Sequence, residues 1–135
     1  MESQSFSVQA IIEEILRKLL ESCDYIIEWN QDIHSSQDYH ISSSTIQTMA
    51  ASCMLIETIG EGFKSIDKRD PEFLEKNFED VPWVNFIGRR NIIAHGYLQI
   101  NARIIFETVK QDIPQLKENL EKFLKKRRLI RIFML

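Results

Sequence analysis

Four side chains that can act on a phosphate ester fall within eight residues of one another, at Arg90, Asn91, His95 and Tyr97. An arginine guanidinium can bind two phosphate oxygens at once, and an imidazole, with an unperturbed pKa of about 6.5, can transfer protons near neutral pH. A lone Arg, Asn or His in a helix is nevertheless usually a solvated or hydrogen-bonded structural residue. The spacing alone favours that structural interpretation, in which Asn91 and His95 bond to each other.

The hydrophobic pattern around these residues predicts a helix from about Pro82 to His95, with Gly96 as its left-handed C-cap. Two neighbouring stripes run along this helix, one of Trp83, Ile87, Arg90 and Ala94 and the other of Val84, Gly88, Asn91 and His95. Because Arg90 interrupts an apolar row, we expect that face to border a groove, another helix or another subunit. Gly88 costs about 1 kcal/mol of helix stability relative to alanine, which indicates close approach of a ligand or a backbone.

His95 is expected in the last helical turn, where the negative end of the helix dipole favours its protonated form. Tyr97 follows the glycine cap, so it leaves the helix axis and can project near His95. The alternative is that the Tyr97 ring packs against the last helix and serves only as core.

The remaining pattern predicts an all-α fold, a single-domain up-down bundle of four or five helices. Apolar residues recur at three- and four-residue steps in each expected helix. The other expected elements are a first helix from Val8 to about Asn30 or His34, a serine-rich loop from His34 to Thr45, a second helix from about Ser44 to Ser65, a short helix from Pro71 to about Lys76, and a last helix from Ala102 that is kinked at Pro114 and continues to about Arg128. We take 1–135 as one domain, with 127–135 as a basic and apolar C-terminal tail.

Composition argues for a cytoplasmic protein that does not enter the membrane. No stretch approaches the roughly 18 apolar residues of a membrane span, and residues 1–8 lack the features of a signal peptide. Cys23 and Cys53 fall within apolar helical patterns and are interpreted as buried thiols. No spacing typical of a metal site occurs, and no glycine-rich phosphate loop is present, so no cofactor is expected.

The charge is unevenly distributed along the chain. The net charge is −3, yet the segment from Lys122 onward contains six basic residues and no acidic one, which leaves 11 basic and 20 acidic residues before it. An acidic body is a poor general binder of nucleic acid, so any RNA contact must be local or shared with a partner chain. Lys125, Lys126, Arg127 and Arg128 could contact RNA phosphates or could equally be a solvated basic helix end. His34 and His40 are interpreted as solvated.

The segment Arg90-Asn91-Ile92-Ile93-Ala94-His95-Gly96-Tyr97 resembles the signature of HEPN domains, and more narrowly that of the HepT-like toxins. Three further segments resemble motifs of the same family. They are Ile59-Gly60-Glu61, Val81-Pro82-Trp83 and Asp112-Ile113-Pro114. The resemblance covers about residues 8–126. It departs from the family at Gly62 and Phe63, where a small alanine is more usual, and in the tail after about Lys126.

This resemblance implies a toxin-type, metal-independent RNA endonuclease with Arg90, Asn91 and His95 as catalytic residues and Glu61 in support. It also implies a homodimer and a partner, a nucleotidyltransferase antitoxin that silences the toxin by adenylylation of Tyr97. The reaction needs two proton transfers, and each chain has one catalytic histidine. A symmetric dimer would supply a second histidine.

Two other classes of function remain open from the sequence. The chain could be a non-catalytic scaffold that binds a nucleotidyltransferase, or a plain helical dimerisation module. The motif favours the nuclease, whereas the acidic body favours the binding module.

Overall fold

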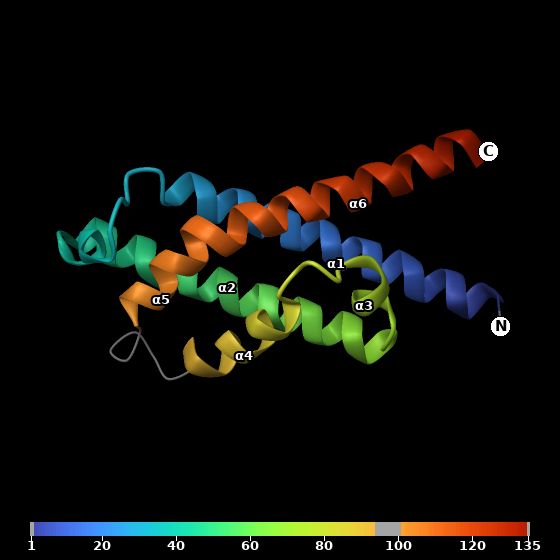
Figure 1. The fold of residues 1–135 in the computed structure, drawn as a ribbon, viewed down its shortest axis with the longest axis horizontal. Coiled ribbons are helices and arrows are strands. Elements are labelled where there is room, and N and C mark those ends of the chain that lie inside the picture. Colours follow the sequence, from blue (N-terminus) through green and yellow to red (C-terminus); the bar gives the residue numbers. More distant parts are fainter. Residues whose placement is uncertain (1, 94–100, 135) are drawn as a thin grey trace.

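The computed structural model describes residues 2–93 and 101–134 of the chain, with side chains from 8 to 88 and from 101 to 134. Its helical elements, in chain order, are α1 (Glu2–Trp29), the 3-10 helix η1 (Ser36–His40), α2 (Ser43–Arg69), α3 (Phe73–Asn77), α4 (Trp83–Ile93), α5 (Ala102–Glu107), the π-helix η3 (Thr108–Asp112) and α6 (Ile113–Met134). The described residues contain helices and no strand, so the expected all-α bundle is confirmed. Figure 1 shows α1, α2, α4 and α6 alternating in direction, as an up-down bundle requires.

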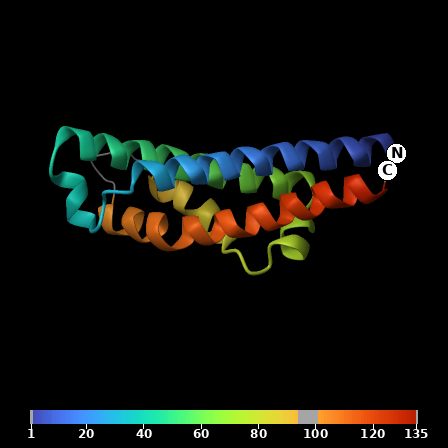
Figure 2. The ribbon, with the colours of Figure 1, turned by 90° about the horizontal axis from the view of Figure 1, so that it is seen from above.

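Helix α1 packs against both α2 and α6. Figure 2 shows these three helices running side by side, with the two ends of the chain at the same end of the bundle. None of the described helices is long and apolar enough to cross a membrane. The elements that lie farthest apart in sequence, α1 and α6, are therefore neighbours in space.

Helices α1 and α2 form the antiparallel pair on which the other elements pack. Their apolar stripes, predicted from helical spacing, are buried; the shared stripe includes Leu16, Leu19, Ile56, Ile59 and Phe63. Ser42 caps α2, because its hydroxyl accepts a hydrogen bond from the backbone N–H of Thr45. Cys23 and Cys53 are both buried free thiols, as expected.

The close approach of α1 to α2 depends on Gly62. A Cβ atom at that position would lie 2.6 Å from Cδ2 of Leu19 and 3.3 Å from Cγ2 of Ile15. The first of these contacts is shorter than any van der Waals separation, so only glycine fits there without a shift of the neighbouring side chain. The departure from the family at Gly62 therefore has a packing reason.

The loop expected between His34 and Thr45 contains the short helix η1, and this helix supplies a core residue. Tyr39 is fully buried, and its hydroxyl donates a hydrogen bond of 2.7 Å to Oδ1 of Asn30. Nδ2 of Asn30 donates to Oγ of Ser52 at 2.8 Å, and Nζ of Lys110 donates to the Asn30 carbonyl oxygen, also at 2.8 Å. This buried polar cluster joins α1, η1, α2 and η3 at one end of the bundle.

The kink or restart predicted near Asp112 from Pro114 is observed as a restart, because the π-helix η3 ends at Asp112 and α6 begins at Ile113. Proline has no N–H to donate to the carbonyl four residues earlier, and its ring crowds that carbonyl. The chain accommodates this with the π-helical turn η3 between α5 and α6. Helix α6 then runs to Met134, beyond the expected end near Arg128, so the described part of the expected tail is helical.

Candidate functional site

The helix predicted to hold the motif is present as α4, and it contains the backbones of Arg90 and Asn91. Their side chains, together with His95, Gly96 and Tyr97 as whole residues, lie outside the described part of the chain. The expected end of the helix at His95, the glycine cap and the placement of Tyr97 therefore stay predictions.

Helix α4 is positioned by its packing against α2. Phe86 is fully buried, and its ring centroid lies 5.8 Å from that of Phe63 on α2. Val81 is buried just before the helix begins, while Trp83 and Ile87 are half-buried beside the core. These buried and half-buried side chains fix the position and direction of α4 against α2. The backbone of Arg90, four residues after Phe86, therefore continues the side of α4 that packs on the bundle.

The neighbouring side of α4 is open. Val84 is 62% exposed, and a Cβ atom at Gly88 would meet no heavy atom of the described residues within 4 Å. The expectation that Gly88 permits a close approach is not met by any element described within this chain. What remains available at Gly88 is space for a ligand or for another molecule. Asn91 follows Gly88 by three residues, so its backbone lies along this open side.

Glu61 lies on the exposed surface of α2, between the buried Gly60 and the half-buried Gly62. It lines a hollow of about 440 Å³ together with side chains that are mostly basic, namely Lys64, Ser65, Lys68 and Arg69. The hollow is on α2, and α2 is the helix that packs against α4. Glu61 therefore sits in a positively charged setting on the helix that supports the motif.

The basic run Lys125–Arg128 divides over different faces of α6. Arg127 is half-buried, with its guanidinium carbon 5.2 Å from the centre of the Phe123 ring, whereas Lys125, Lys126 and Arg128 are more open to solvent. Figure 1 places this part of α6 in the half of the molecule that holds both termini, whereas α4 runs toward the other end. The structure thus does not bring the run beside the described part of α4.

The other titratable groups singled out from the sequence do not form a second site. His34 and His40 are exposed, as expected for solvated residues. Burial raises the pKa of the Cys23 and Cys53 thiols to about 12 each. A thiol with such a pKa is almost entirely protonated near neutral pH, so neither cysteine is an activated nucleophile.

One charged surface is not apparent from the sequence. A groove of about 640 Å³ lies between α1 and α6, and its lining includes Glu13, Arg17 and Arg131. Glu13 and Arg131 form an ion pair across it, although they are far apart in sequence. Charged residues on the flank of an apolar stripe look like ordinary solvated positions, so no local signal could have paired them.

Comparison with known proteins matches most of the chain to one family. The model of the family described as "Ribonuclease HepT-like" matches residues 12–123. A Methanocaldococcus jannaschii protein named "Putative RNase MJ1380" is 33% identical over 110 residues, which cover 82% of this chain and 94% of that protein. The Thermococcus cleftensis protein named "Probable ribonuclease HepT" is 28% identical over 113 residues, covering 84% of this chain and 96% of that protein. No solved structure gives a significant match.

Proposed function

The chain belongs to the ribonuclease HepT-like family, and on that premise we propose that it is a metal-independent RNA endonuclease of a toxin–antitoxin pair. The observation that supports this most strongly is the complete Arg90–Tyr97 motif inside the matched range, in a chain whose relatives have RNase names. The motif helix is also firmly anchored through Phe86 while one of its sides stays open.

In the proposed reaction, His95 removes the proton from a ribose 2′-hydroxyl, and the 2′-oxygen attacks the adjacent phosphorus. Arg90 binds the phosphate oxygens, where negative charge increases as the phosphorane forms. The bond from phosphorus to the 5′-oxygen then breaks, and that oxygen takes up a proton. The products are a 2′,3′-cyclic phosphate and a free 5′-hydroxyl. Asn91 orients His95 or the phosphate, and Glu61 supports the site from α2.

The proposed active form is a homodimer with the open side of α4 turned toward a shared cleft. The exposed Val84 offers apolar surface there, and the free space at Gly88 allows a second helix to approach closely. Such a pairing would place two histidines and two arginines around one cleft. One His95 would then act as the base while the other protonates the leaving oxygen.

The proposed means of control is adenylylation of Tyr97 by a partner nucleotidyltransferase. The tyrosine oxygen attacks the α-phosphorus of ATP, pyrophosphate leaves, and AMP remains attached to the ring. The added phosphate brings negative charge close to Arg90 and His95, which would repel an RNA phosphate from the same place. Tyr97→Phe should lose the added mass yet keep most RNA cleavage.

Cleavage of RNA by the purified protein in EDTA tests the proposed activity. His95→Ala should lower the rate by about 100-fold or more, since general acid–base groups contribute at least that much. His34→Ala and His40→Ala are matched controls, because both histidines are exposed and lie on other elements. Equal cleavage by His95→Ala and the parent protein would remove the assigned active site.

The alternative is a non-catalytic scaffold that binds a nucleotidyltransferase, and the acidic body favours it. In that case the purified protein cleaves no RNA, but it still forms a stable complex with its partner. Sedimentation of the two proteins together, with and without RNA, measures that complex.

A further inference from the structure

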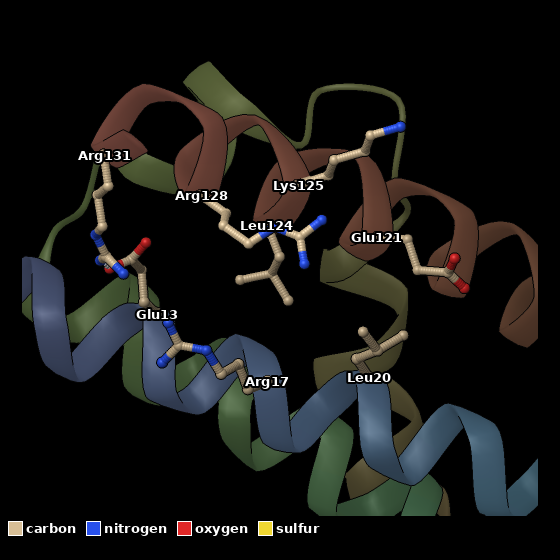
Figure 3. Close-up of a pocket in the computed structure, with 8 residues that line it drawn as sticks. All are labelled: Glu13, Arg17, Leu20, Glu121, Leu124, Lys125, Arg128 and Arg131. Carbon is tan, nitrogen blue, oxygen red and sulfur yellow. Dashed lines mark hydrogen bonds and ion pairs between the residues drawn. The ribbon is translucent and has the colours of Figure 1, made fainter. Parts of the chain in front are cut away.

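A groove lies between α1 and α6, and the parts of these helices that line it are in the half of the bundle that holds both termini (Figure 1). Figure 3 shows Glu13, Arg17 and Leu20 reaching into it from α1, opposite Leu124, Arg128 and Arg131 on α6. Its volume of about 640 Å³ is in the range of small-ligand sites. Leu20 and Leu124 provide an apolar floor, and charged side chains surround it.

Positive charge prevails around the groove. Four basic residues line it against two carboxylates; the basic ones are Arg17, Lys125, Arg128 and Arg131, and the acidic ones are Glu13 and Glu121. Both carboxylates have cationic partners, since Glu13 pairs with Arg131 and Glu121 lies 3.7 Å from Lys117.

The basic side chains of the groove differ in whether a carboxylate of this chain already pairs with them. Arg17 is 3.3 Å from the exposed Glu14, which lies outside the groove. Lys125 and Arg128 have no ion pair within the described residues. The ammonium of Lys125 points away from α1, whereas Arg128 lies beside Leu124 (Figure 3). Arg17 and Arg128 are therefore the cations best placed to meet an anion inside the groove.

Glu13 adds a second, independent sign of a ligand. Its side chain is only 8% exposed, and Oε2 accepts a hydrogen bond from Nη2 of Arg131. The other oxygen, Oε1, is buried and has no hydrogen-bond partner among the described residues. Buried carboxylate oxygens nearly always accept a hydrogen bond, so a donor is missing at this point. A hydroxyl group of a ligand in the groove would supply it.

We propose that this groove binds the phosphate and ribose of a ribonucleotide within an RNA strand. Arg17 and Arg128 would contact the phosphate, Oε1 of Glu13 would accept a hydrogen bond from a ribose hydroxyl, and the base would rest on Leu20 and Leu124. The assignment of the ligand as RNA rests on the proposed function, because the groove would hold a part of the RNA substrate remote from the cleavage motif. The acidic body leaves few other places where an RNA phosphate could be held.

The groove is built partly outside the region that the family shares. The family match ends at residue 123, whereas Lys125, Arg128 and Arg131 come after it. The C-terminal turns of α6 therefore add the cationic wall to a fold whose other wall, α1, lies within the match. RNA contact here is a property of this chain and is separate from the chemistry of the motif.

The test is the binding of a short, fluorescently labelled single-stranded RNA, measured by anisotropy with the His95→Ala protein in EDTA so that the strand stays intact. Arg17→Ala and Arg128→Ala should each weaken binding about 10-fold and reduce the salt dependence of log K by about 0.7, the value for one lost phosphate contact to a single strand. Lys18→Ala and Arg103→Ala are the controls, since both side chains are exposed and neither lines the groove; Lys18 lies beside it on α1 and Arg103 lies on α5. Equal losses in the controls would overturn the proposal.

The ribose contact is tested with DNA of the same sequence and with Glu13→Leu. The parent groove should prefer RNA. Leucine is close to glutamate in size but has no polar side-chain atom, so it can neither accept a hydrogen bond from a ribose hydroxyl nor donate one to it. Glu13→Leu should therefore abolish the preference for RNA over DNA, and an unchanged preference would contradict the assignment.

Competition with AMP distinguishes an RNA strand from a free nucleotide as the ligand of the groove. Displacement of the RNA by AMP at micromolar concentration, dependent on Arg17 and Arg128, would assign the site to a free nucleotide and overturn the strand. No displacement in that range supports the strand. Failure of the proposed nuclease would appear in the cleavage assay and would leave these binding results unchanged, so the two hypotheses can fail separately.

Discussion

Alanine at Gly62 and alanine at Gly88 should change stability in opposite directions. Each substitution removes a glycine from a helix interior, which favours the fold by up to about 1 kcal/mol. At Gly88 nothing lies within 4 Å of the new Cβ atom, so this gain is unopposed. At Gly62 the new atom would be 2.6 Å from Cδ2 of Leu19, and Leu19 is only 1% exposed. Its methyl group therefore has no solvent into which to move.

Overpacking a filled core by one carbon costs about 1–3 kcal/mol. Subtracting the helix gain leaves Gly62→Ala less stable than the parent by about 1 kcal/mol, whereas Gly88→Ala is more stable by about the same amount. The two variants should thus differ by about 2 kcal/mol, or about 8 °C in melting temperature for a chain of this length.

Urea denaturation followed by circular dichroism measures both free energies of unfolding, at a fixed low protein concentration. Equal stabilisation by the two substitutions would refute the close approach of α1 to α2. Repeating the Gly88→Ala series at higher concentration tests the proposed dimer as well. If the open side of α4 packs against a second chain, the gain in stability should shrink as dimers form.

Three further predictions concern buried or hydrogen-bonded polar groups. Tyr39→Phe should lower the free energy of unfolding in urea by about 1–2 kcal/mol, because Oδ1 of Asn30 loses its donor while Asn30 stays 1% exposed. Cys23 and Cys53 should resist thiol reagents at pH 8 and react on unfolding in urea, since burial raises the pKa of each to about 12. The same shift predicts loss of stability above about pH 9 in alkaline denaturation, because the unfolded thiols ionise there first. Hydrogen bonds from the backbone N–H groups of residues 34 and 35 lower the pKa of Asp38. The ionised Asp38 therefore stabilises the fold at neutral pH, and this contribution is lost as the pH falls through the lowered pKa. Asp38→Asn should make the melting temperature less dependent on pH in the acid range.

The long helices could be predicted from sequence because helical periodicity follows directly from burial of one face. Their ends were less accurate, since α1 begins at Glu2 instead of Val8 and α2 continues to Arg69 instead of Ser65. The first turns of α1 are polar apart from Phe6, so the pattern weakens there before the helix begins, whereas the end of α2 adds one more buried residue, Ile66, that extends the stripe. Pro114 was informative because its effect on the backbone is local.

Residues whose roles depend on distant parts of the chain could not be predicted in the same way. Tyr39 lies in a polar segment, yet its ring belongs to the hydrophobic core and its hydroxyl donates to Asn30. Gly62 and Gly88 were even harder to distinguish, because Gly62 is crowded and Gly88 is open although each lies within a helix. The difference depends on which neighbouring helix faces the residue, and that is a tertiary property.

The candidate functional residues show the same difference between local signals and tertiary ones. The motif from Arg90 to Tyr97 could be found from sequence because its residues are consecutive and resemble a known family. The groove could not, because its two walls come from opposite ends of the chain and its key oxygen is distinguished only by burial without a partner.

The charge distribution connects these two regions. The body before Lys122 is strongly acidic, and the six basic residues from that point onward all lie on α6, five of them in its second half. An RNA strand approaching this molecule would be repelled by most of its surface and attracted to that end of α6. On this argument the acidic composition does not oppose the nuclease hypothesis. It restricts where RNA can first bind, and that place is the groove rather than the motif. Arg128→Glu should therefore slow association with RNA, measured by stopped-flow anisotropy, more than it slows cleavage of RNA already bound, whereas His95→Ala should do the reverse.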